Sequence, residues 1–396
     1  METTDAFAGL ACRDCGHQFD AADAPGRCPD CGGILDPQYD LDAVSLAPED
    51  PEGPVDSMWR YEALLPFPRS TAVTMDEGGT PLVSCPALAE EWGVGEVLLK
   101  DEGRNPTGTF KDRGQSVAVT AAVQHGADDV ALASAGNAGQ AAAAYAARAG
   151  LDAHVFLPSR AGFTQKAMVN VHGGDLTVVG GRIGDAGAAF EDAMADEPDW
   201  HALQTFVTPY RHDGKKTMYY EIAEQRDWTA PDAVVYPTGG GVGLVGMYEG
   251  ARDLRELGWV DGGPAFYAAQ ASGCAPIVEA FESGAAVHEA VEHPDTICGG
   301  IEIPDPGASP WILEALRASG GGAVATDDDA ILQAGVDVAQ LEGLEMGATC
   351  AAAASGARAL AERGEFGPDD TVVLLNTGSA NKDADVLRSH LMGQGV

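Results

Sequence analysis

Short apolar segments alternate with small-residue segments along most of this chain of 396 residues. The segments Val130–Ala133, His154–Leu157 and Leu176–Val179 have the length and composition of buried strands. The alanine-rich stretch Gln140–Ala149, between the first two, has the composition of a helix. Strands that alternate with helices form mainly parallel sheets, and ligands of such sheets bind at the carboxyl ends of the strands. The sequence therefore predicts the α/β fold class.

A second series of strands and helices begins at Ala233–Tyr236 and ends at Thr371–Leu375. Because a chain of this length holds two or three domains, we expect two α/β lobes with a cleft between them. The expected ranges are 8–40 for a cysteine module, 41–74 for a linker or arm, 75–205 for the first lobe with a smaller α/β domain, and 206–396 for the second lobe. The two lobes can exchange segments.

The segment 47–69 is rich in acidic residues and in proline, with Pro48, Pro51, Pro54, Pro66 and Pro68. Proline-rich polar segments act as extended spacers between domains. We therefore predict a linker that crosses the protein surface before the first lobe begins.

Four cysteines near the N-terminus form two pairs with two residues inside each pair: Cys12, Cys15, Cys28 and Cys31. A glycine follows the second cysteine of each pair, which suits the tight turns in which backbone amides approach thiolate sulfur. Four thiolates in two such turns make a closed, structural metal site, for which zinc is the usual ion and iron the alternative. The remaining cysteines are scattered, and we expect them to pack in the core: Cys85, Cys274, Cys298 and Cys350.

Acidic residues greatly outnumber basic ones, 61 against 23, for a formal net charge of -38. This charge argues against nucleic acid and anionic membranes as partners. Because the acidic residues are spread along the chain, we expect a halophilic protein of a high-salt cytoplasm, where screening relieves self-repulsion. No apolar run is long enough to span a bilayer, and the first ten residues lack the basic region of a secretory signal.

One of only six lysines, Lys111, lies at the end of the glycine-containing turn Asn105–Phe110. A small-residue helix is predicted directly after it, so the side chain can project into a cleft. A lysine amine attacks a carbonyl when burial or neighbouring cations lower its pKa. Lys111 is therefore the candidate carbonyl-binding residue, and a surface lysine beside Asp112 is the ordinary alternative.

Two glycine-rich turns each follow a predicted strand. The first contains Asn137, whose amide can bond the oxygen of a flat ring or, more ordinarily, cap the backbone. The second consists of Gly239, Gly240, Gly241, Val242 and Gly243 before a predicted helix. Backbone N–H groups in such a turn, together with the positive end of the helix, bind a phosphate group. The turn lacks the Lys-Ser/Thr ending of a nucleotide P-loop, which disfavours ATP and GTP.

The lysine turn, read PTGTFKDRG, resembles the cofactor-lysine segment of the threonine synthase family, whose members are pyridoxal-phosphate enzymes of fold type II. Further similar strings are Gly78–Leu82, Gln270–Ile277 and Asn376–Asp383, so that the resemblance covers about residues 75–385. Several members also carry an N-terminal zinc ribbon. The resemblance implies a two-lobed fold like that of the tryptophan synthase β subunit, with a small zinc-ribbon module in front.

The resemblance also implies the roles of individual residues. Lys111 would hold pyridoxal 5'-phosphate, Asn137 would contact its phenolic oxygen, and Thr377 would place a hydroxyl near its pyridine nitrogen. The glycine turn of residues 239–243 would bind the cofactor phosphate, and the four N-terminal cysteines would bind structural zinc. We expect Arg211, Lys215 and Lys216 to form a cationic mouth; Arg160, Arg211 and Lys166 are candidates for a substrate phosphate.

The activity implied is that of a lyase of threonine biosynthesis, which converts O-phosphohomoserine and water to L-threonine and phosphate. The expected partner is a small amino-acid substrate, and the expected assembly is a homodimer in the cytoplasm. Two alternatives stay open. One is a threonine or serine ammonia-lyase on the same fold, and the other is a catalytically inactive homologue with a binding role.

Overall fold

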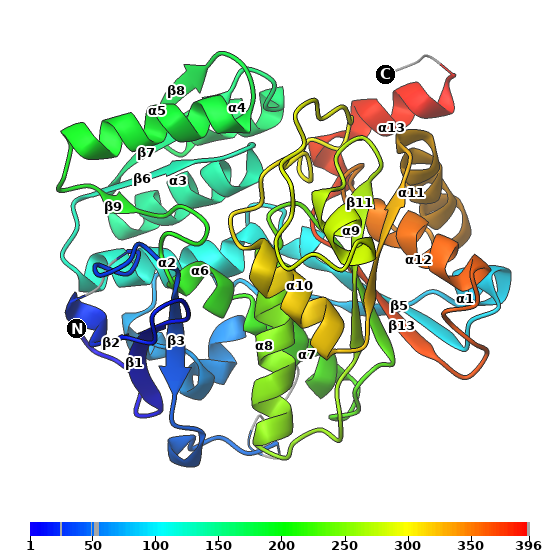
Figure 1. Cartoon of the computed structure of the whole chain (residues 1–396), viewed down its shortest axis with the longest axis horizontal. Helices are drawn as coiled ribbons and strands as arrows, with labels where there is room; N and C mark the ends of the chain where they lie inside the picture. The colour runs from blue at the N-terminus through cyan, green and yellow to red at the C-terminus, as the bar shows by residue number, and fades with distance from the viewer. Residues whose placement is uncertain (24–25, 49, 51–54, 394–396) are drawn as a thin grey trace. The chain divides into compact units, whose positions relative to one another are not determined.

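The computed structural model describes residues 1–23, 26–48, 50 and 55–393, and the chain forms two compact units (Figure 1). Unit 1 comprises Met1–Gly79 and Lys111–Met218, and unit 2 comprises Thr80–Phe110 and Tyr219–Val396. The division differs from the one expected from sequence, because residues 80–110 belong with the C-terminal part of the chain.

Unit 2 contains a six-stranded sheet with the strand order β12-β11-β10-β13-β5-β4. Its strands are β4 (Leu82–Ser84), β5 (Glu96–Asp101), β10 (Ala233–Pro237), β11 (Ala265–Ala271), β12 (Gly322–Thr326) and β13 (Thr371–Asn376). Only β4 runs antiparallel to its neighbour among these strands. Residues 80–110 enter this unit because β5 pairs in parallel with β13 along its whole length. The middle strand β10 is buried at every residue, as the apolar sequence of a central parallel strand requires.

The helices of unit 2 surround this sheet (Figure 1). They are α1 (Pro86–Trp92), α8 (Val242–Glu256), α9 (Pro276–Glu282), α10 (Ser309–Ala318), α11 (Asp328–Glu342), α12 (Ala352–Glu362) and α13 (Ala384–Leu391), with the short η5 (Glu102–Arg104) and η6 (Ala380–Lys382). The helix α7 (Lys216–Gln225) begins at the end of unit 1 and continues into unit 2. Small residues of α12 allow close packing on the sheet: a Cβ atom at Gly356 would lie 2.9 Å from side-chain atoms of Ala269 and Val324.

Unit 1 contains a four-stranded parallel sheet with the order β8-β7-β6-β9. Its strands are β6 (Asp129–Ala133), β7 (Asp152–Pro158), β8 (Asp175–Val179) and β9 (His201–Ala202). Its helices are α2 (Lys111–Gln124), α3 (Asn137–Ala149), α4 (Phe163–Val171), α5 (Ile183–Asp196) and α6 (Tyr210–Asp213). No helix within the described ranges is long and apolar enough to cross a membrane.

The N-terminal module of unit 1 is a three-stranded antiparallel sheet of order β2-β1-β3, built from β1 (Phe7–Cys12), β2 (Gln18–Phe19) and β3 (Leu35–Tyr39). The short helical turn η1 (Ala21–Asp23) lies between β2 and β3, and three more follow β3: η2 (Leu41–Ala43), η3 (Met58–Leu64) and η4 (Arg69–Thr71).

The linker predicted for residues 47–69 does not stay on the surface. Its apolar side chains between residues 58 and 67, such as Trp59 and Phe67, are fully buried in unit 1. The Trp59 indole donates to Glu77 Oε1 over 2.7 Å, and Tyr145 donates to the other oxygen of Glu77 over 2.8 Å. The prediction of a surface path was therefore wrong for these residues, because large apolar side chains gain more from burial than a polar spacer does. Pro51 and Pro54 lie outside the described residues.

Candidate active site

The lysine turn is held in place by the loop that follows β13. Phe110 donates its backbone N–H to Thr377 O over 3.0 Å, and Ser379 donates to Gly108 O over 2.9 Å. Gly108 has a positive φ of 79°, a conformation that favours glycine. The turn ends at Phe110, and Lys111 is the first residue of α2 and is partly buried. The predicted junction of turn and helix at this lysine is thus present.

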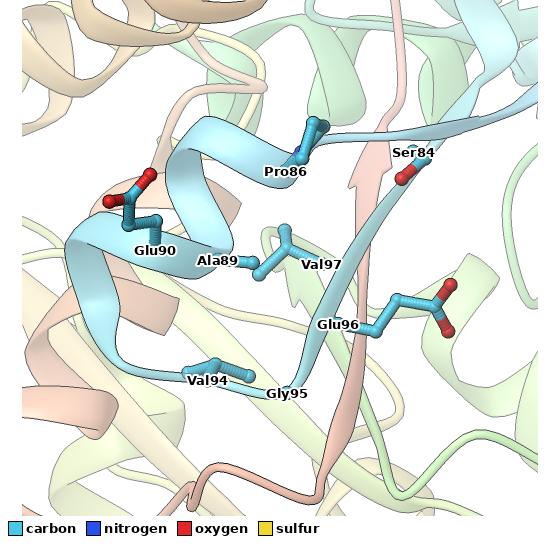
Figure 2. A pocket seen from close by; sticks show the side chains of 8 residues that line it. All are labelled: Ser84, Pro86, Ala89, Glu90, Val94, Gly95, Glu96 and Val97. Atoms are coloured by element: carbon cyan, nitrogen blue, oxygen red, sulfur yellow. The ribbon is translucent and has the colours of Figure 1, made fainter.

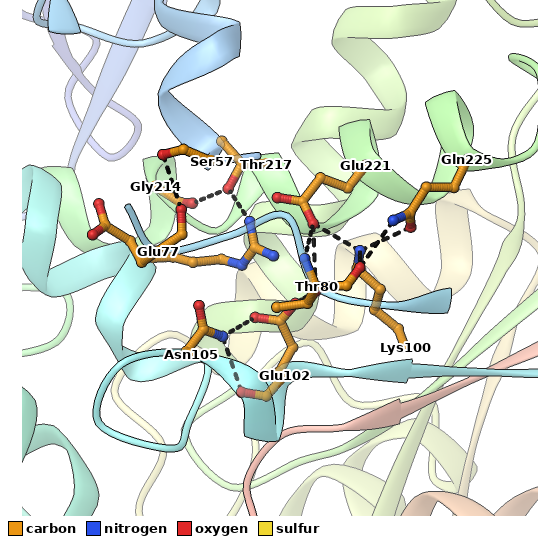
Figure 3. Close-up of polar contacts among 11 residues, drawn as sticks. Ser57, Glu77, Thr80, Lys100, Glu102, Asn105, Gly214, Thr217, Glu221 and Gln225 are labelled. Atoms are coloured by element: carbon orange, nitrogen blue, oxygen red, sulfur yellow. Dashed lines mark hydrogen bonds and ion pairs between the residues drawn. The ribbon is translucent and has the colours of Figure 1, made fainter. Parts of the chain in front are cut away.

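The buried carboxylate of Glu102 fixes the start of the same turn (Figure 3). Thr80 donates its hydroxyl to Glu102 Oε1 over 2.6 Å, and Asn105 donates its amide to Oε2 over 2.8 Å. We did not identify Glu102 as a site residue from the sequence. It could have been identified as an acidic residue that directly follows a buried strand and precedes Asn105 by three residues.

A second lysine, Lys100, is fully buried and serves the structure rather than chemistry. Its ammonium donates to Glu221 Oε2 over 2.7 Å, to Thr80 O over 2.7 Å and to Gln225 Oε1 over 2.9 Å (Figure 3). The side chains of Lys100 and Glu221 have no exposed surface. An amine held by three acceptors, one of them a carboxylate, is not available as a nucleophile.

The turn between β6 and α3 is capped by Ser134. Its hydroxyl oxygen accepts from the backbone N–H groups of Gly136 over 3.0 Å and Gly139 over 3.1 Å. Asn137 therefore does not act as the backbone cap that the ordinary interpretation assigned to it. It is the first residue of α3, and its Oδ1 accepts from Gln165 Nε2 over 3.3 Å.

The glycine turn between β10 and α8 leaves several backbone donors unused. Within the described parts of the chain, the N–H groups of Gly239, Gly240, Gly241 and Val242 donate to no protein acceptor. Gly241, with φ of 72°, is the N-cap residue directly before α8. The first N–H groups of a helix lack partners inside the helix and favour anions. Together, these four amides form a candidate phosphate site.

Side chains enclose this turn on most sides. A Cβ atom at Gly239 would lie 2.9 Å from Ile303, and one at Gly241 would overlap Ile312. By contrast, no heavy atom lies within 4 Å of a Cβ built at Gly240. The turn is thus closely packed against the protein and open at Gly240.

Thr377 directly follows β13, and its hydroxyl lies 3.2 Å from the thiol of Cys350. Burial raises the pKa of Cys350 to about 12, so the thiol stays protonated, and it donates to Gly378 O over 3.4 Å. Nearby, Asp383 accepts from the backbone N–H of Ala348 over 3.1 Å. Burial raises the pKa of this carboxyl to about 6. The loop after β13 therefore carries the hydroxyl of Thr377 and the carboxyl of Asp383, whose pKa is raised.

The expected cationic mouth is absent, because Arg211, Lys215 and Lys216 are all buried. Lys216 pairs with Asp213 over 2.8 Å. Arg211 donates from Nη1 to Leu203 O over 3.1 Å, but its buried Nε and Nη2 have no partner among the described residues. Burial lowers the pKa of this guanidinium to about 10. The prediction of a cationic mouth was wrong for these residues, because their side chains are buried within unit 1.

The four N-terminal cysteines come together as predicted, with all four sulfur atoms within 4.8 Å of one another. Cys12 and Cys31 lie 3.5 Å apart, and Cys15 and Cys28 lie 3.7 Å apart. A tetrahedral ion with bonds of about 2.3 Å to sulfur would separate its ligands by about 3.8 Å. Burial opposes ionisation of Cys12, but backbone donors at positions 15 and 14 lower its pKa to about 7. The donor set fits a thiolate-bound metal ion. The other four cysteines are buried and unbonded to one another, as expected.

A separate surface pocket lies between α1 and the start of β5 (Figure 2). Its lining includes Ala89, Val94 and Val97, with Glu90 and Glu96 as the charged members. The pocket is at the amino end of β5, whereas Thr377 follows the carboxyl end of the parallel strand β13. It is therefore not part of the candidate active site.

Residues 73–378 match the model of a family described as pyridoxal-phosphate dependent enzyme. Threonine synthase of Methanosarcina acetivorans is 38% identical over 375 residues, 94% of this chain and 92% of that protein. Threonine synthase of Methanocaldococcus jannaschii is 34% identical over 378 residues, 94% of this chain and 93% of that protein.

Solved structures share the fold at lower identity. A fungal L-serine ammonia-lyase from Rhizomucor miehei has a TM-score of 0.67 at 22% identity, over 79% of this chain and 97% of that one. Maize serine racemase has a TM-score of 0.67 at 19% identity, over 79% of this chain and 92% of that one. These structures confirm the expected fold, and the curated relatives carry the closer resemblance. The chain belongs to the pyridoxal-phosphate-dependent enzymes and, within them, to the threonine synthase family.

Proposed function

We propose that this protein converts O-phosphohomoserine and water to L-threonine and phosphate. The observation that carries the proposal is an identity of 34–38% to threonine synthases over 94% of the chain. Ammonia-lyases and a racemase share only the fold, at 22% identity or less among those compared. The synthase reaction is therefore favoured over the ammonia-lyase alternative.

The residues present fit pyridoxal phosphate. The four backbone donors of residues 239–242, which have no acceptor within the part of the chain that the structure describes, suit a phosphate dianion, and the beginning of α8 adds its positive end. We assign the turn Gly239–Gly243 to the cofactor phosphate, Lys111 to the aldehyde carbon, Asn137 to the ring oxygen and Thr377 to the ring nitrogen. When bound, the cofactor withdraws electrons from the substrate and stabilises carbanions.

Lys111 is assigned the proton transfers. Its amine would take the proton from the substrate α carbon and would move protons at the β and γ carbons in turn. Over the whole reaction, phosphate would leave from the γ carbon and water would add at the β carbon. The hydroxyl of Thr377 is neutral, so it stabilises positive charge on the ring nitrogen less than a carboxylate would.

Of the three candidates for the substrate phosphate, Arg211 is favoured. Arg160 is exposed, and Lys166 already donates to Ser159 O over 2.9 Å. The Nε and Nη2 atoms of Arg211 form the edge that binds a phosphate through two parallel hydrogen bonds. This edge is buried and without a partner among the described residues, which is costly unless an anion completes it. Its position beside Leu203, which bonds to β6, puts it in the same unit as Lys111 and Asn137.

We propose that Cys12, Cys15, Cys28 and Cys31 bind one structural zinc ion, supported by their sulfur distances and tight turns. We also propose that the protein is adapted to high salt, which the net charge of -38 supports. A homodimer in the cytoplasm is proposed from the resemblance to the threonine synthase family. Sedimentation at several potassium chloride concentrations tests the assembly and its salt requirement together.

A product assay tests the proposed reaction. The purified protein with pyridoxal phosphate receives O-phosphohomoserine, threonine or serine separately, and phosphate, threonine and 2-oxo acids are measured. Phosphate and threonine from the first substrate alone support the synthase. Rapid 2-oxobutyrate from threonine, with no turnover of O-phosphohomoserine, assigns the protein to the ammonia-lyases. A protein that takes up no cofactor is the inactive homologue.

A further inference from the structure

Among the described residues, the side chain of Asn137 is hydrogen-bonded by Gln165 of α4. Its Nε2 donates to Asn137 Oδ1 over 3.3 Å. The other polar atom of Asn137, the amide Nδ2, donates to no protein acceptor among the described residues. Asn137 is partly buried rather than enclosed, so this NH₂ group is available to a ligand.

The position of Gln165 is set by two glycines. A Cβ atom at Gly136 would lie 3.1 Å from Gln165 Cγ, and one at Gly162 would overlap Gln165 Oε1. Oε1 itself is buried and has no hydrogen-bond partner among the described residues. The contact between Nε2 and Asn137 is therefore the polar interaction that the Gln165 side chain makes, and the glycines leave room for it.

A terminal amide presents either a donor or an acceptor, depending on how it is rotated. When Gln165 donates to Oδ1 of Asn137, the Nδ2 group of Asn137 is left to donate to a ligand. Gln115 also reaches the start of α3, where its Nε2 donates to Ala138 O over 3.3 Å. That contact holds the backbone and leaves the rotation of the Asn137 amide undetermined.

We propose that Gln165 is a positioning residue that rotates the amide of Asn137, so that Nδ2 donates to the ring oxygen of pyridoxal phosphate. The proposal rests on the cofactor contact proposed for Asn137. A donor at this position stabilises the ionised ring oxygen, and an acceptor repels it. Gln165 thus acts on the cofactor through Asn137 and without touching it.

The test uses Gln165→Glu, which keeps the shape of the side chain and removes its donor. The carboxylate accepts from Asn137 Nδ2, so the amide turns and its carbonyl faces the ring oxygen. We expect the visible absorption of the ionised cofactor to fall in favour of the near-ultraviolet band. We also expect pyridoxal-phosphate affinity to weaken about 10-fold, as for loss of a charge-assisted hydrogen bond. Asn170→Asp adds the same charge at an exposed residue of α4 and is expected to leave both unchanged.

A double-mutant cycle separates positioning from a general effect on folding. In an Asn137→Ala background, Gln165→Glu is expected to have no further effect on the spectrum or on the affinity. An unaltered spectrum and affinity in Gln165→Glu overturns the inference, and so does an equal change in the Asn137→Ala background. Failure of the unaltered protein to bind pyridoxal phosphate refutes the proposed function itself, so the two failures are distinguishable.

Discussion

Phe110 and Thr377 are joined through their backbones, with the Phe110 N–H 3.0 Å from the Thr377 carbonyl oxygen. An antiparallel bridge between Thr109 and Gly378 continues this pairing. Lys111 follows Phe110 directly, so the position of the candidate lysine depends on a loop more than 260 residues later in the chain. Because both contacts involve main-chain atoms, the hydroxyl of Thr377 is left for other partners.

Replacing Lys111 by alanine is expected to abolish the borohydride-reducible bond to pyridoxal phosphate and the visible absorption of the protein. The reason is that the aldehyde carbon loses its amine. Lys166→Ala is the suitable control, since that lysine lies near the surface and bonds only to a carbonyl among the contacts described. A reducible bond that persists in Lys111→Ala, located by peptide mapping, would refute the assignment.

Gly240 and Gly241 are expected to respond differently to alanine. Gly241→Ala places a methyl group against Ile312 at φ of 72°, and we expect a loss of about 1–3 kcal/mol in unfolding free energy. Gly240→Ala meets no protein atom, so it should fold normally. Its methyl group would occupy the open side of the turn and weaken cofactor binding at least about 10-fold. Thermal unfolding without cofactor and fluorescence titration with it measure the two effects. Normal cofactor affinity in Gly240→Ala would contradict the phosphate assignment.

The buried ion pair of Lys100 and Glu221 is expected to make a strongly non-additive contribution to the free energy of unfolding. Lys100→Met removes the cation beside the buried carboxylate of Glu221 and should cost about 3–5 kcal/mol of unfolding free energy. Glu221→Leu removes the anion beside the buried ammonium of Lys100, with a similar cost. The double variant removes both charges and should be more stable than either single variant. Urea denaturation at constant high salt measures all four proteins, and additive losses would show that the pair is not coupled.

Ionisation of Asp383 is expected to lower the free energy of unfolding as the pH rises. Burial raises its pKa from 3.8 to about 6, so the folded protein binds this proton more tightly than the unfolded chain. Its stabilising contribution is therefore complete below the unfolded pKa and is lost as the pH rises through about 4 to 6.

Asp383→Asn keeps an oxygen that can accept from Ala348 and removes the ionisation. We expect it to gain about 1–2 kcal/mol of unfolding free energy at pH 7 and nothing at pH 4. Asp261→Asn, at an exposed position, is the matched control. Denaturation curves between pH 4 and 7 give the comparison, and a gain that does not depend on pH would rule out this cause.

Loss of the proposed zinc should affect substrate binding more than cofactor binding. Strand β3 of the ribbon contacts α6 through Asp36, which lies 3.0 Å from His212, and through Tyr39, which donates to Asp213 over 2.6 Å. Arg211 directly precedes these two partners in α6 and is the candidate for the substrate phosphate.

In Cys12→Ser/Cys28→Ser we expect no bound zinc, retained pyridoxal-phosphate absorption, and a KM for O-phosphohomoserine raised by more than kcat falls. Metal analysis, absorption and steady-state kinetics provide these values. Loss of cofactor binding in a protein that remains folded would contradict a purely structural metal.

Much of the fold was predictable from local sequence. The buried strands around Val130, Val155 and Val235 are apolar on both faces, and that composition is sufficient to predict parallel strands. The spacing of the cysteine pairs and the turn before Lys111 were likewise local patterns. Each depends on side chains within a few residues of one another, which is why the sequence was enough.

Burial and partner choice were decided by the tertiary structure. Lys100 meets Glu221 from 121 residues away, and Asn137 meets Gln165 from a different helix. From the sequence we expected Arg211 in a cationic mouth, because three basic residues are grouped within residues 211–216 of a chain that has few of them. The folded protein buries it beneath other elements of unit 1 and leaves one edge of its guanidinium without a partner among the described residues. The type of a residue determines its charge and hydrogen-bonding groups, but the surrounding fold determines whether water, protein or a ligand satisfies them.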